Sequence, residues 1–465
     1  MTSFSGLISK IQDILNEVFG KDENQVSPNI VLSSDMSKSI GKWNGMYCGE
    51  PQKNQNGRKM RSMRLAAAIP SEIARMTTLE FKSEISGSAR ADYLNDQYQK
   101  FLRNIRTYVE FACAKGGIIF KPYVSRKDVY FNAVQADAFF PTAFDGSGKI
   151  TGAVFTERLT VGNAFYTRIE IHSLENSVYK IINTAYKSSS ENDIGTRVPL
   201  SDVYQWADIA ETAEFTADFP LFAYFKPAGA NHISPESPLG VSVFSKAVDL
   251  IEDADDLYTQ LLWEFESGRR KIFASSDLLK PDGNGGFKLP AGCDSDVFTS
   301  LDGGTREKDL FVSISPEFRD ASIKSGLNEI LRKIELVCGL AYGTISDVQE
   351  TDKTATEVKI SRQRTYSTVC DTQKALKIAL EDYIRAVNFY TDFYKLAPKG
   401  DYGVSFDFDD SVIVDSEEQR KALLQEVAAG VAPRYEYRMK IKSEDKKQAK
   451  KMLAEVDPFN GEPEE

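Results

Sequence analysis

The chain has 465 residues, 27% of them charged and 42% hydrophobic, and carries a formal net charge of −11. This length exceeds what one hydrophobic core usually supports, so we expect two or more domains or subdomains, and the composition is that of a folded protein. The acidic excess argues against a free-standing nucleic-acid binder, because tight phosphate binding needs an excess of Lys and Arg, but it does not exclude a protein that DNA passes by.

The first segment, "MTSFSGLISKIQDILNEVFG", predicts an amphipathic helix. Its apolar residues recur at helical spacing with Asp13 and Glu17 opposite, whereas a signal peptide would need a continuous apolar stretch. Residues 21–60 are polar and contain several glycines, and we expect loops there. Residues 61–81 and residues 91–116 are each expected to form a helix.

A β-rich block is predicted over residues 117–228. Apolar and polar residues alternate in "KDVYFNAV", "ITGAVFTERLTV", "AFYTRIEIHSL" and "SVYKIINTAYK", and clusters of Gly, Asn and Ser that favour turns separate these stretches. We therefore expect an antiparallel sheet domain.

Two long helices with a small β-like insert between them follow this block. Pro238 and Gly240 end the β pattern, and a helix of about 28 residues is expected after them. The insert covers residues 271–316, where "KPDGNGGFKLPAG" predicts a hairpin turn by its Asp-Gly and Gly-Gly pairs. From residue 317 to about 342, one apolar stripe predicts the second helix.

The longest helix is predicted to start after the polar stretch "ISDVQETDKTATEVKISRQRT". Thr354 and Glu357 have the spacing of a capping box, and no proline occurs before Pro398. The pattern leaves room for a helix of about 43 residues, roughly 65 Å long. Apolar residues are sparse before position 376 and dense after it, so we expect the first half at a wet or intersubunit surface and the second half in a core.

The chain after this helix has fewer clear secondary-structure patterns. "YGVSFDFDD" is expected to form a short strand pair. Residues 416–455 look helical and rich in charges of both signs, and the chain ends in the acidic tail "NGEPEE".

A search for chemistry finds no strong catalytic or metal-binding pattern. The two histidines, His172 and His232, are both interpreted as structural. "AFDGSGKIT" lacks a phosphate loop's first glycine and final Ser or Thr, and "FDFDDSVIVDSEE" lacks the spacing of a calcium loop. The five scattered cysteines argue against a zinc site or disulfide framework, and no apolar run is long enough to span a bilayer. We predict no catalytic residue, no metal and no cofactor.

The order of these parts resembles the portal, or head-to-tail connector, proteins of tailed double-stranded DNA bacteriophages of the siphophage type. The resemblance covers roughly residues 90–430 and is one of layout and local pattern, without an invariant catalytic motif. The stretches that carry it are "SPLGVSVFSKAVDLIEDADDLYTQLLWEFESGRRKIF", "LNEILRKIELVCGLAYGTISD", "TDKTATEVKISRQRTYSTV", "ALEDYIRAV" and "FDFDDSVIVDSEEQ".

The resemblance implies an α+β portal-like architecture with a β-rich wing, a two-helix stem, a small α/β clip, a very long wing helix and a helical crown. The implied parts are residues 1–235 as the N-terminal part of the wing, 236–268 as a stem helix, 269–316 as the clip, 317–345 as a stem helix, 346–354 as the tunnel loop, 355–415 as the long helix and wing strands, and 416–465 as the helical crown and acidic tail.

The resemblance also implies a structural role without enzymatic activity. The expected assembly is a ring of twelve subunits, or thirteen on overexpression, at one capsid vertex of the virion, made in the host cytoplasm. Double-stranded DNA would be packaged and ejected through its channel. The expected partners are the terminase large subunit, then the head-completion adaptor, and the major capsid and scaffolding proteins, with no membrane involved.

Three groups of residues are assigned to this function. The first faces DNA in the tunnel loop: Asp347, Gln349, Glu350, Thr351, Asp352 and Lys353. The second would line the channel as an acidic stem that repels phosphates: Asp249, Glu252, Asp253 and Asp256. The third would dock partners at the clip: Arg269, Arg270, Lys271, Lys280 and Lys288.

Two alternatives stay open. The chain could be another virion component, such as a capsid or tail-tube protein, although a helix of this length after a polar loop is not expected there. It could also be a soluble enzyme built on the β-rich block, which would require acid and base residues converging on a pocket.

Overall fold

The computed structural model describes residues 4–19, 28–53, 57, 59–126, 128–191, 193–267, 271–275, 280–281, 287–288, 298–301, 311–314, 319–347, 355–408, 423–430, 433–442 and 453. The chain divides into two compact units, one of Met1–Thr77 with Ile85–Gly403 and one of Thr78–Glu84 with Val404–Glu465. The described residues form helices and mainly antiparallel strands, which confirms the predicted α+β class.

The larger sheet of the first unit confirms the predicted β-rich block. Its strands follow the order β4-β5-β6-β7-β8, with β9 paired to β7, and all pairs are antiparallel. Their bounds are β4 Phe139–Phe144, β5 Ile150–Val161, β6 Ala164–Glu175, β7 Val178–Ser188, β8 Thr196–Val198 and β9 Thr212–Thr216. The turn between β4 and β5 is the rejected phosphate-loop stretch, where Asp145 Oδ1 accepts from the backbone N–H of Ser147 at 2.8 Å and of Lys149 at 2.9 Å.

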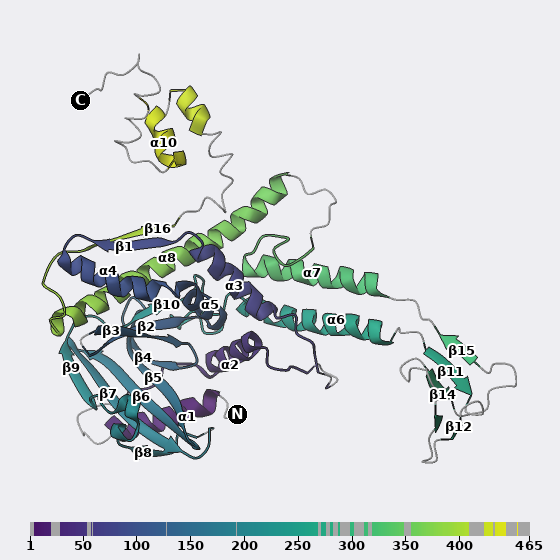
Figure 1. The fold of residues 1–465 in the computed structure, drawn as a ribbon, viewed down its shortest axis with the longest axis horizontal. Coiled ribbons are helices and arrows are strands. Elements are labelled where there is room, and N and C mark those ends of the chain that lie inside the picture. Colours follow the sequence, from purple (N-terminus) through teal and green to yellow (C-terminus); the bar gives the residue numbers. More distant parts are fainter. Residues whose placement is uncertain are drawn as a thin grey trace. The chain divides into compact units, whose positions relative to one another are not determined.

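The predicted N-terminal helix is confirmed as α1, Phe4–Phe19, and it packs on this sheet (Figure 1). Apolar residues at helical spacing, among them Ile11 and Leu15, are fully buried against Phe140 of β4 and Ile169 of β6. One amphipathic face of α1 therefore closes one side of the sheet.

A second sheet, in the order β10-β2-β3, lies beside two helices, and an aromatic core forms between these elements. Its strands are β2 Ile118–Ser125, β3 Asp128–Gln135 and β10 Ala223–Phe225. The helices are α4 Ala89–Leu102 and α5 Ile105–Lys115. The rings of Phe101, Phe120 and Tyr383 meet in the core, with Phe101 stacked 4.3 Å from Tyr383.

The prediction of one helix over residues 91–116 is wrong, because the chain breaks at Arg103 and Asn104 between α4 and α5. The break brings the rings of Phe101 and Tyr108 to 5.6 Å. In an unbroken helix these residues would be about 10 Å apart along the axis. Packing of the aromatic core therefore overrides local helix continuity.

The prediction of loops throughout residues 21–60 is also wrong, because Ser34–Cys48 form helix α2. The Ser33 hydroxyl accepts from the Met36 N–H at 3.2 Å and starts the helix, and Gly49 ends it in the left-handed conformation at φ +71°. The apolar residues Ile40 and Trp43 are buried and hold α2 in place despite its internal glycines.

The predicted helix over residues 61–81 is shorter, as α3 Leu65–Thr78. After it comes a strand that the sequence did not predict, β1 Lys82–Ser86, which pairs with β16 Gly403–Asp407. The predicted strand pair within "YGVSFDFDD" is therefore a single strand with a distant partner. The Ser83 hydroxyl donates to the Ser405 carbonyl at 2.7 Å, and Phe81 stacks on Phe408.

Helices α6 Val248–Ser267 and α7 Asp320–Cys338 lie side by side and run in opposite directions (Figure 1). The first begins later than predicted, because a short 3-10 turn, Ser245–Ala247, precedes it. The second ends at Gly339, which takes the left-handed conformation at φ +73°. Its apolar stripe is confirmed, since Leu327, Leu331 and Ile334 are buried.

The insert between α6 and α7 contains two small sheets. One has the order β14-β11-β15, in which β11 is parallel to β14 and antiparallel to β15. The other is the antiparallel pair β12-β13, which confirms the predicted hairpin. The bounds are β11 Lys271–Ser275, β12 Lys280–Pro281, β13 Phe287–Lys288, β14 Phe298–Leu301 and β15 Phe311–Ile314.

The predicted longest helix is confirmed as α8, Ala355–Phe393, with 39 residues. Its second half is buried as predicted, for example at Leu380 and Tyr383, although Ile378 is 62% exposed and Phe393 is 52% exposed. The prediction of a wet first half is wrong over residues 365–373, where Thr365 and Val369 are buried. Thr354 of the predicted capping box lies outside the described residues.

Little of the predicted helical C-terminus is described. A helical stretch covers residues 423–428, where Leu423 is buried, and α10 covers Arg434–Lys442. The candidate capping residues Asp415 and Ser416 lie outside the described residues.

Candidate functional site

The first candidate feature is the contact between α6 and α7, which one ion pair ties together at the end next to the insert. Arg319 Nη2 donates to Glu264 Oε2 at 2.9 Å, and the Arg319 backbone N–H donates to Glu264 Oε1 at 3.2 Å. Hydrogen bonds from Arg319 lower the pKa of Glu264. The first residue of the α7 side is thus fixed to the last turns of α6.

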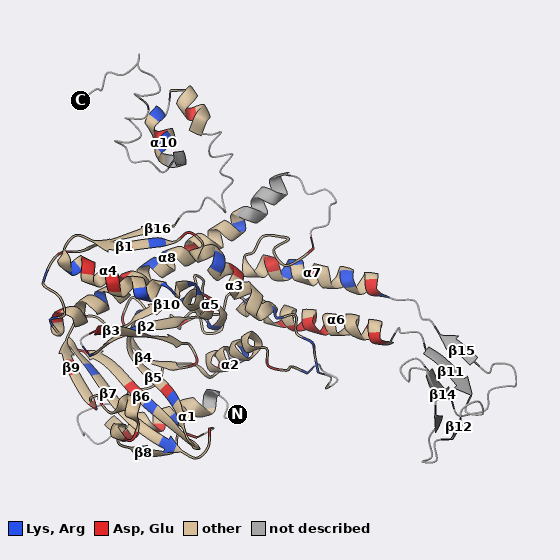
Figure 2. Cartoon of the chain, in the orientation of Figure 1, with Lys and Arg blue, Asp and Glu red and all other residues tan. Residues whose placement is uncertain are grey.

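Acidic residues recur along α6 (Figure 2), and their spacing divides them between two faces of the helix. Asp249, Asp253 and Asp256 stand four and three positions apart and therefore share one face, on which Asp249 and Asp253 are exposed. Glu252 is turned to α2 instead, where Lys42 Nζ lies 2.9 Å from its Oε1. Of the four predicted channel-lining carboxylates, the structure groups three on one face.

The described residues 59–63 contact α6. Lys53 and Lys59 pair as an antiparallel bridge. The Arg61 N–H donates to the Thr259 hydroxyl at 2.8 Å, and the Met63 N–H donates to Asp255 Oδ1 at 2.7 Å. Burial raises the pKa of Asp255, which the hydrogen bond from Met63 opposes. This segment is held to α6 by its backbone.

The segment that leaves α7 is organised around one buried carboxylate. Glu335 is 0% exposed, and its oxygens accept from the N–H of Ile345 at 2.7 Å and of Ser346 at 2.9 Å. They also accept from the Ser346 hydroxyl at 2.8 Å and from the Gly343 N–H at 3.2 Å. The charge is solvated by the turn that it holds, in the way that backbone N–H groups cradle a bound anion.

Asn328 continues this anchoring to the last described residue before the polar loop. Its side chain accepts from the Asp347 N–H at 2.8 Å and donates to the Asp347 carbonyl at 3.3 Å. We call residues 339–347, with their contacts to α7, the loop base. The loop base also contacts α8, because the Thr368 hydroxyl donates to the Gly339 carbonyl at 3.1 Å and the Arg364 guanidinium lies over the Tyr342 ring.

Of the predicted tunnel-loop residues, the structure describes only Asp347, which is exposed. The others lie outside the described residues: Gln349, Glu350, Thr351, Asp352 and Lys353. The sequence did not predict Glu335 and Asn328 as anchors, because their partners follow in a loop whose conformation has no sequence pattern.

The predicted clip cations are described in part. Arg269 and Arg270 lie outside the described residues, and Lys271 is the first residue of β11, opposite Ile314 of β15. The β12-β13 pair places Lys280 directly opposite Lys288. Like charges in that register destabilise an isolated strand pair.

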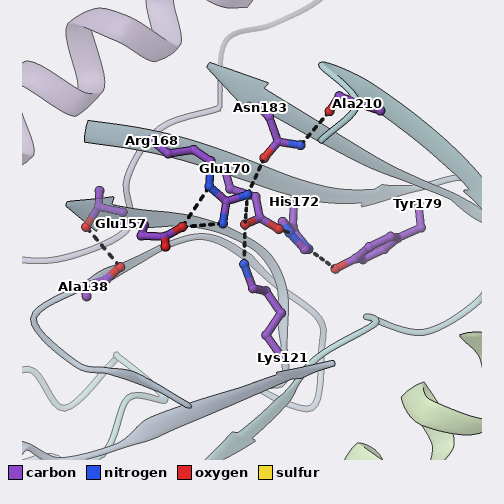
Figure 3. A network of polar contacts seen from close by, with 10 residues as sticks. Lys121, Ala138, Glu157, Arg168, Glu170, His172, Tyr179, Asn183 and Ala210 are labelled. Carbon is purple, nitrogen blue, oxygen red and sulfur yellow. Dashed lines mark hydrogen bonds and ion pairs between the residues drawn. The ribbon is translucent and has the colours of Figure 1, made fainter. Parts of the chain in front are cut away.

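A buried polar network in the larger sheet is the one part of the described chain that resembles catalytic machinery (Figure 3). His172 Nε2 lies 2.7 Å from Glu170 Oε1, and His172 Nδ1 lies 2.5 Å from the Tyr179 hydroxyl. Lys121 donates to Glu170, and Arg168 Nη1 lies 3.3 Å from Glu170 Oε2. All of these side chains except that of Lys121 come from β6 and β7.

The network extends to the neighbouring strands β5 and β7 through Arg168. Its Nη2 donates to Glu157 Oε2 at 2.7 Å, and its Nη1 donates to Asn183 Oδ1 at 3.2 Å. Asn183 in turn donates to the Ala210 carbonyl at 3.0 Å. A cavity of about 550 Å³ lies beside the network, lined in part by Lys121 and Glu157.

The electrostatics of this network suit support rather than proton transfer to a substrate. Burial lowers the pKa of His172, although Glu170 opposes the shift, so the imidazole is neutral at pH 7. Burial raises the pKa of Glu170, but Lys121, His172 and Arg168 together hold it well below its usual range. His172 is 1% exposed and cannot reach a ligand in solvent, which agrees with its predicted structural role.

Within the described ranges, no group of three His, Cys, Asp or Glu side chains is arranged to hold a metal ion. No helix in that part of the chain is both long and apolar enough to cross a bilayer.

Comparison with known proteins gives one clear match. A family model described as "Phage portal protein, SPP1 Gp6-like" matches residues 38–457. No curated protein sequence matches the chain. Among solved structures, a chain of the "Neck of native GTA particle computed with C12 symmetry" is similar, with 11% identity and a TM-score of 0.44, over 92% of this chain and 98% of that one.

Proposed function

The chain belongs to the SPP1 Gp6-like family of phage portal proteins, and on this basis we propose that copies of it form a ring around a channel for double-stranded DNA. The role is structural, and the protein is a component of the virion. In the proposed ring, twelve subunits sit at one capsid vertex, and DNA enters during packaging and leaves during ejection.

The loop base is the observation that carries this proposal. A channel protein that contacts a passing polymer needs its contact residues attached to a firm support. Glu335 and Asn328 give the segment after α7 such a support, and the chain enters the polar residues 348–354 directly from it. We assign Asp347, Gln349, Glu350, Thr351, Asp352 and Lys353 to DNA contact.

The α6 and α7 pair supplies the stem of the proposed ring. That the shared face of Asp249, Asp253 and Asp256 repels DNA in the channel stays a prediction. Glu252 has a partner within its own chain, Lys42, and contributes less negative potential to any channel.

The small sheets between α6 and α7 are assigned to partner docking, first of the terminase large subunit and then of the head-completion adaptor. The facing residues Lys280 and Lys288 support this assignment. A strand pair that carries two lysines opposite each other gains stability when an acidic partner covers it. Lys271 and the neighbouring Arg269 and Arg270 belong to the same proposed surface.

Mass photometry and negative-stain microscopy of the purified chain test the assembly. We expect rings of about a dozen subunits with a central opening. A monodisperse monomer would contradict the proposal. In a packaging assay, Gln349→Ala with Lys353→Ala is expected to reduce packaging or retention of DNA, and unchanged packaging would remove the loop from the proposal while leaving the ring.

A further inference from the structure

The segment of residues 51–64, which we call the basic segment, has an unusual charge for an acidic chain. It contains Lys53, Arg58, Lys59, Arg61 and Arg64 and no Asp or Glu. Lys53, Lys59 and Arg61 are exposed, and none forms an ion pair within the part of the chain that the structure describes. Arg58 lies outside the described residues.

Of the described cations, only Arg64 helps to hold the basic segment, because its Nη1 donates to the Cys48 carbonyl at 2.9 Å. Its contacts with α6 come from the backbone N–H groups of Arg61 and Met63, which donate to Thr259 and Asp255. Lys59 also lines a cavity of about 500 Å³ between the segment and α6, together with Tyr258 and Glu50. The side chains of Lys53, Lys59 and Arg61 therefore stay available for a partner outside the subunit.

The complementary charge lies on the same turns of α6. The basic segment bonds to positions 255 and 259, and the exposed Asp253 and its neighbour Asp256 are within one or two turns of these positions. Asp249 and Asp253 point away from Asp255, because residues two and six places apart lie on different sides of a helix, whereas Asp256 is three places from Thr259 and shares its side. One subunit thus presents cations and carboxylates at one level of α6 but in different directions.

In a ring with cyclic symmetry, the cations of one subunit can meet the carboxylates of the next. A ring contact joins two different patches of the same chain, and the rotation keeps each patch at its own height along the axis. Patches can meet across a subunit boundary only if their heights agree, as these do when α6 runs along the axis. Lys42 and Glu252 show within one chain that an α6 carboxylate pairs with a cation from the N-terminal region.

We propose that Lys53, Lys59 and Arg61 of one copy dock on the exposed carboxylates of Asp249 and Asp253 of the next copy in the ring. This inference rests on the proposed ring, and it places these two carboxylates at the boundary between subunits instead of on the channel wall. A second copy suits the basic segment better than a DNA backbone, because the cavity behind the segment holds carboxylates, Glu50 and Asp255, that disfavour phosphate.

Charge reversal tests the contact. Lys59→Glu with Arg61→Glu places like charges opposite each other at every subunit boundary, and rings counted by mass photometry at about 0.1 M salt are expected to fall by about tenfold or more. Asp249→Lys with Asp253→Lys is expected to act in the same way. The backbone bonds of Arg61 survive its substitution, so circular dichroism should show a folded subunit in both cases.

Rescue separates a direct contact from misfolding. The two variants mixed together, or all four substitutions in one chain, restore opposite charges at the boundary, and rings are expected to return. Lys395→Glu with Lys399→Glu is the matched control, because it makes the same change in net charge at exposed residues far along the sequence and should leave rings intact.

The outcomes are distinct. Failure of the wild type to form rings overturns the proposed function. Wild-type rings with undiminished variant rings, or with no rescue, overturn the contact alone. Variant rings in which Lys59→Glu with Arg61→Glu has lost binding to a short DNA duplex would assign the basic segment to DNA. Variant rings in which only Asp249→Lys with Asp253→Lys alters packaging would assign the acidic face to the channel.

Discussion

The larger sheet and helix α6 differ in the burial and pairing of their charged side chains. In the larger sheet, Glu170 and Arg168 of β6 are buried and pair with each other, and Glu170 also pairs with the buried Lys121 of β2 in the second sheet. On α6, Asp249 and Asp253 are exposed and have no ion-pair partner among the described residues. Burying paired charges is costly and contributes little net stability, whereas breaking such a pair is severe.

The difference indicates which part of the chain is complete by itself. The sheet satisfies its own charges and covers one side with α1, so its stability depends on contacts within the subunit. Asp249 and Asp253 of α6 and the cations Lys53, Lys59 and Arg61 of the basic segment have opposite charges, and none of them forms an ion pair among the described residues. In the proposed ring, these charges contribute to the stability of the assembly.

The largest expected effect is a loss of stability on removing a buried charge from the larger sheet. Glu170→Gln removes the carboxylate between Lys121 and Arg168 and is expected to cost about 3–5 kcal/mol of unfolding free energy. Thermal unfolding followed by circular dichroism measures the loss. Glu214→Gln on β9 is the control, because its ion pair with Lys180 is largely exposed and should matter little. Equal shifts for the two variants would refute the difference.

The next effect concerns the loop base. Glu335→Gln replaces one of the accepting oxygens by an amide that cannot accept from the N–H groups of Ile345 and Ser346, and about 1–3 kcal/mol of local stability is expected to be lost. Hydrogen exchange of the amides at 343–346 should accelerate accordingly. Glu329→Gln, exposed on the same helix, is expected to leave exchange unchanged. Equal protection in all three proteins would show that the carboxylate does not hold the turn.

Acidification should weaken the sheet before it affects α6. Because the folded pKa of His172 is lowered, the unfolded state binds more protons, and stability is complete above the unfolded pKa of about 6.5 and falls as pH drops below it. Glu170, whose folded pKa is also lowered, adds a further loss below about pH 4.3. Melting temperatures from pH 8 to pH 4 measure this trend, which His172→Gln should flatten between pH 6.5 and pH 5.

The smallest expected effect on stability comes from removing the exposed carboxylates of α6. Asp249→Asn with Asp253→Asn should change the stability of a single folded subunit by no more than about 0.5 kcal/mol, because exposed substitutions away from special features rarely do more. Unfolding at concentrations too low for assembly measures it. A loss as large as that of Glu170→Gln would mean that these residues have partners within the subunit.

Local patterns predicted much of the fold. The amphipathic N-terminus, the alternating strands of the larger sheet and the proline-free run of α8 each carry their signal within a short window. Helix α2 was not predicted because its glycines disfavour a helix locally and its apolar residues are few. Burial of Trp43 and Ile40 in the core stabilises it. The split of α4 from α5 depends on ring packing that no local window contains.

The candidate site was less predictable than the fold. The acidic character of α6 is visible in the sequence, but the division of its carboxylates between an exposed face and Lys42 depends on where α2 packs. Glu335 and Asn328 lie within a helical pattern that gives no reason to single them out. The basic segment lies in a stretch interpreted as loops, and its relation to α6 appears only when Arg61 and Thr259 come together in space.

The pairing of β1 with β16 sets an order in time for the making of this protein. The hydrogen bond from Ser83 to Ser405 closes a separation of 322 residues, so the strand at Lys82–Ser86 has to wait for its partner to be translated. At a synthesis rate of about 5–20 residues per second, that wait is about 16–64 s. During that interval β1 is an unpaired strand on a nascent chain, and the second unit matures last.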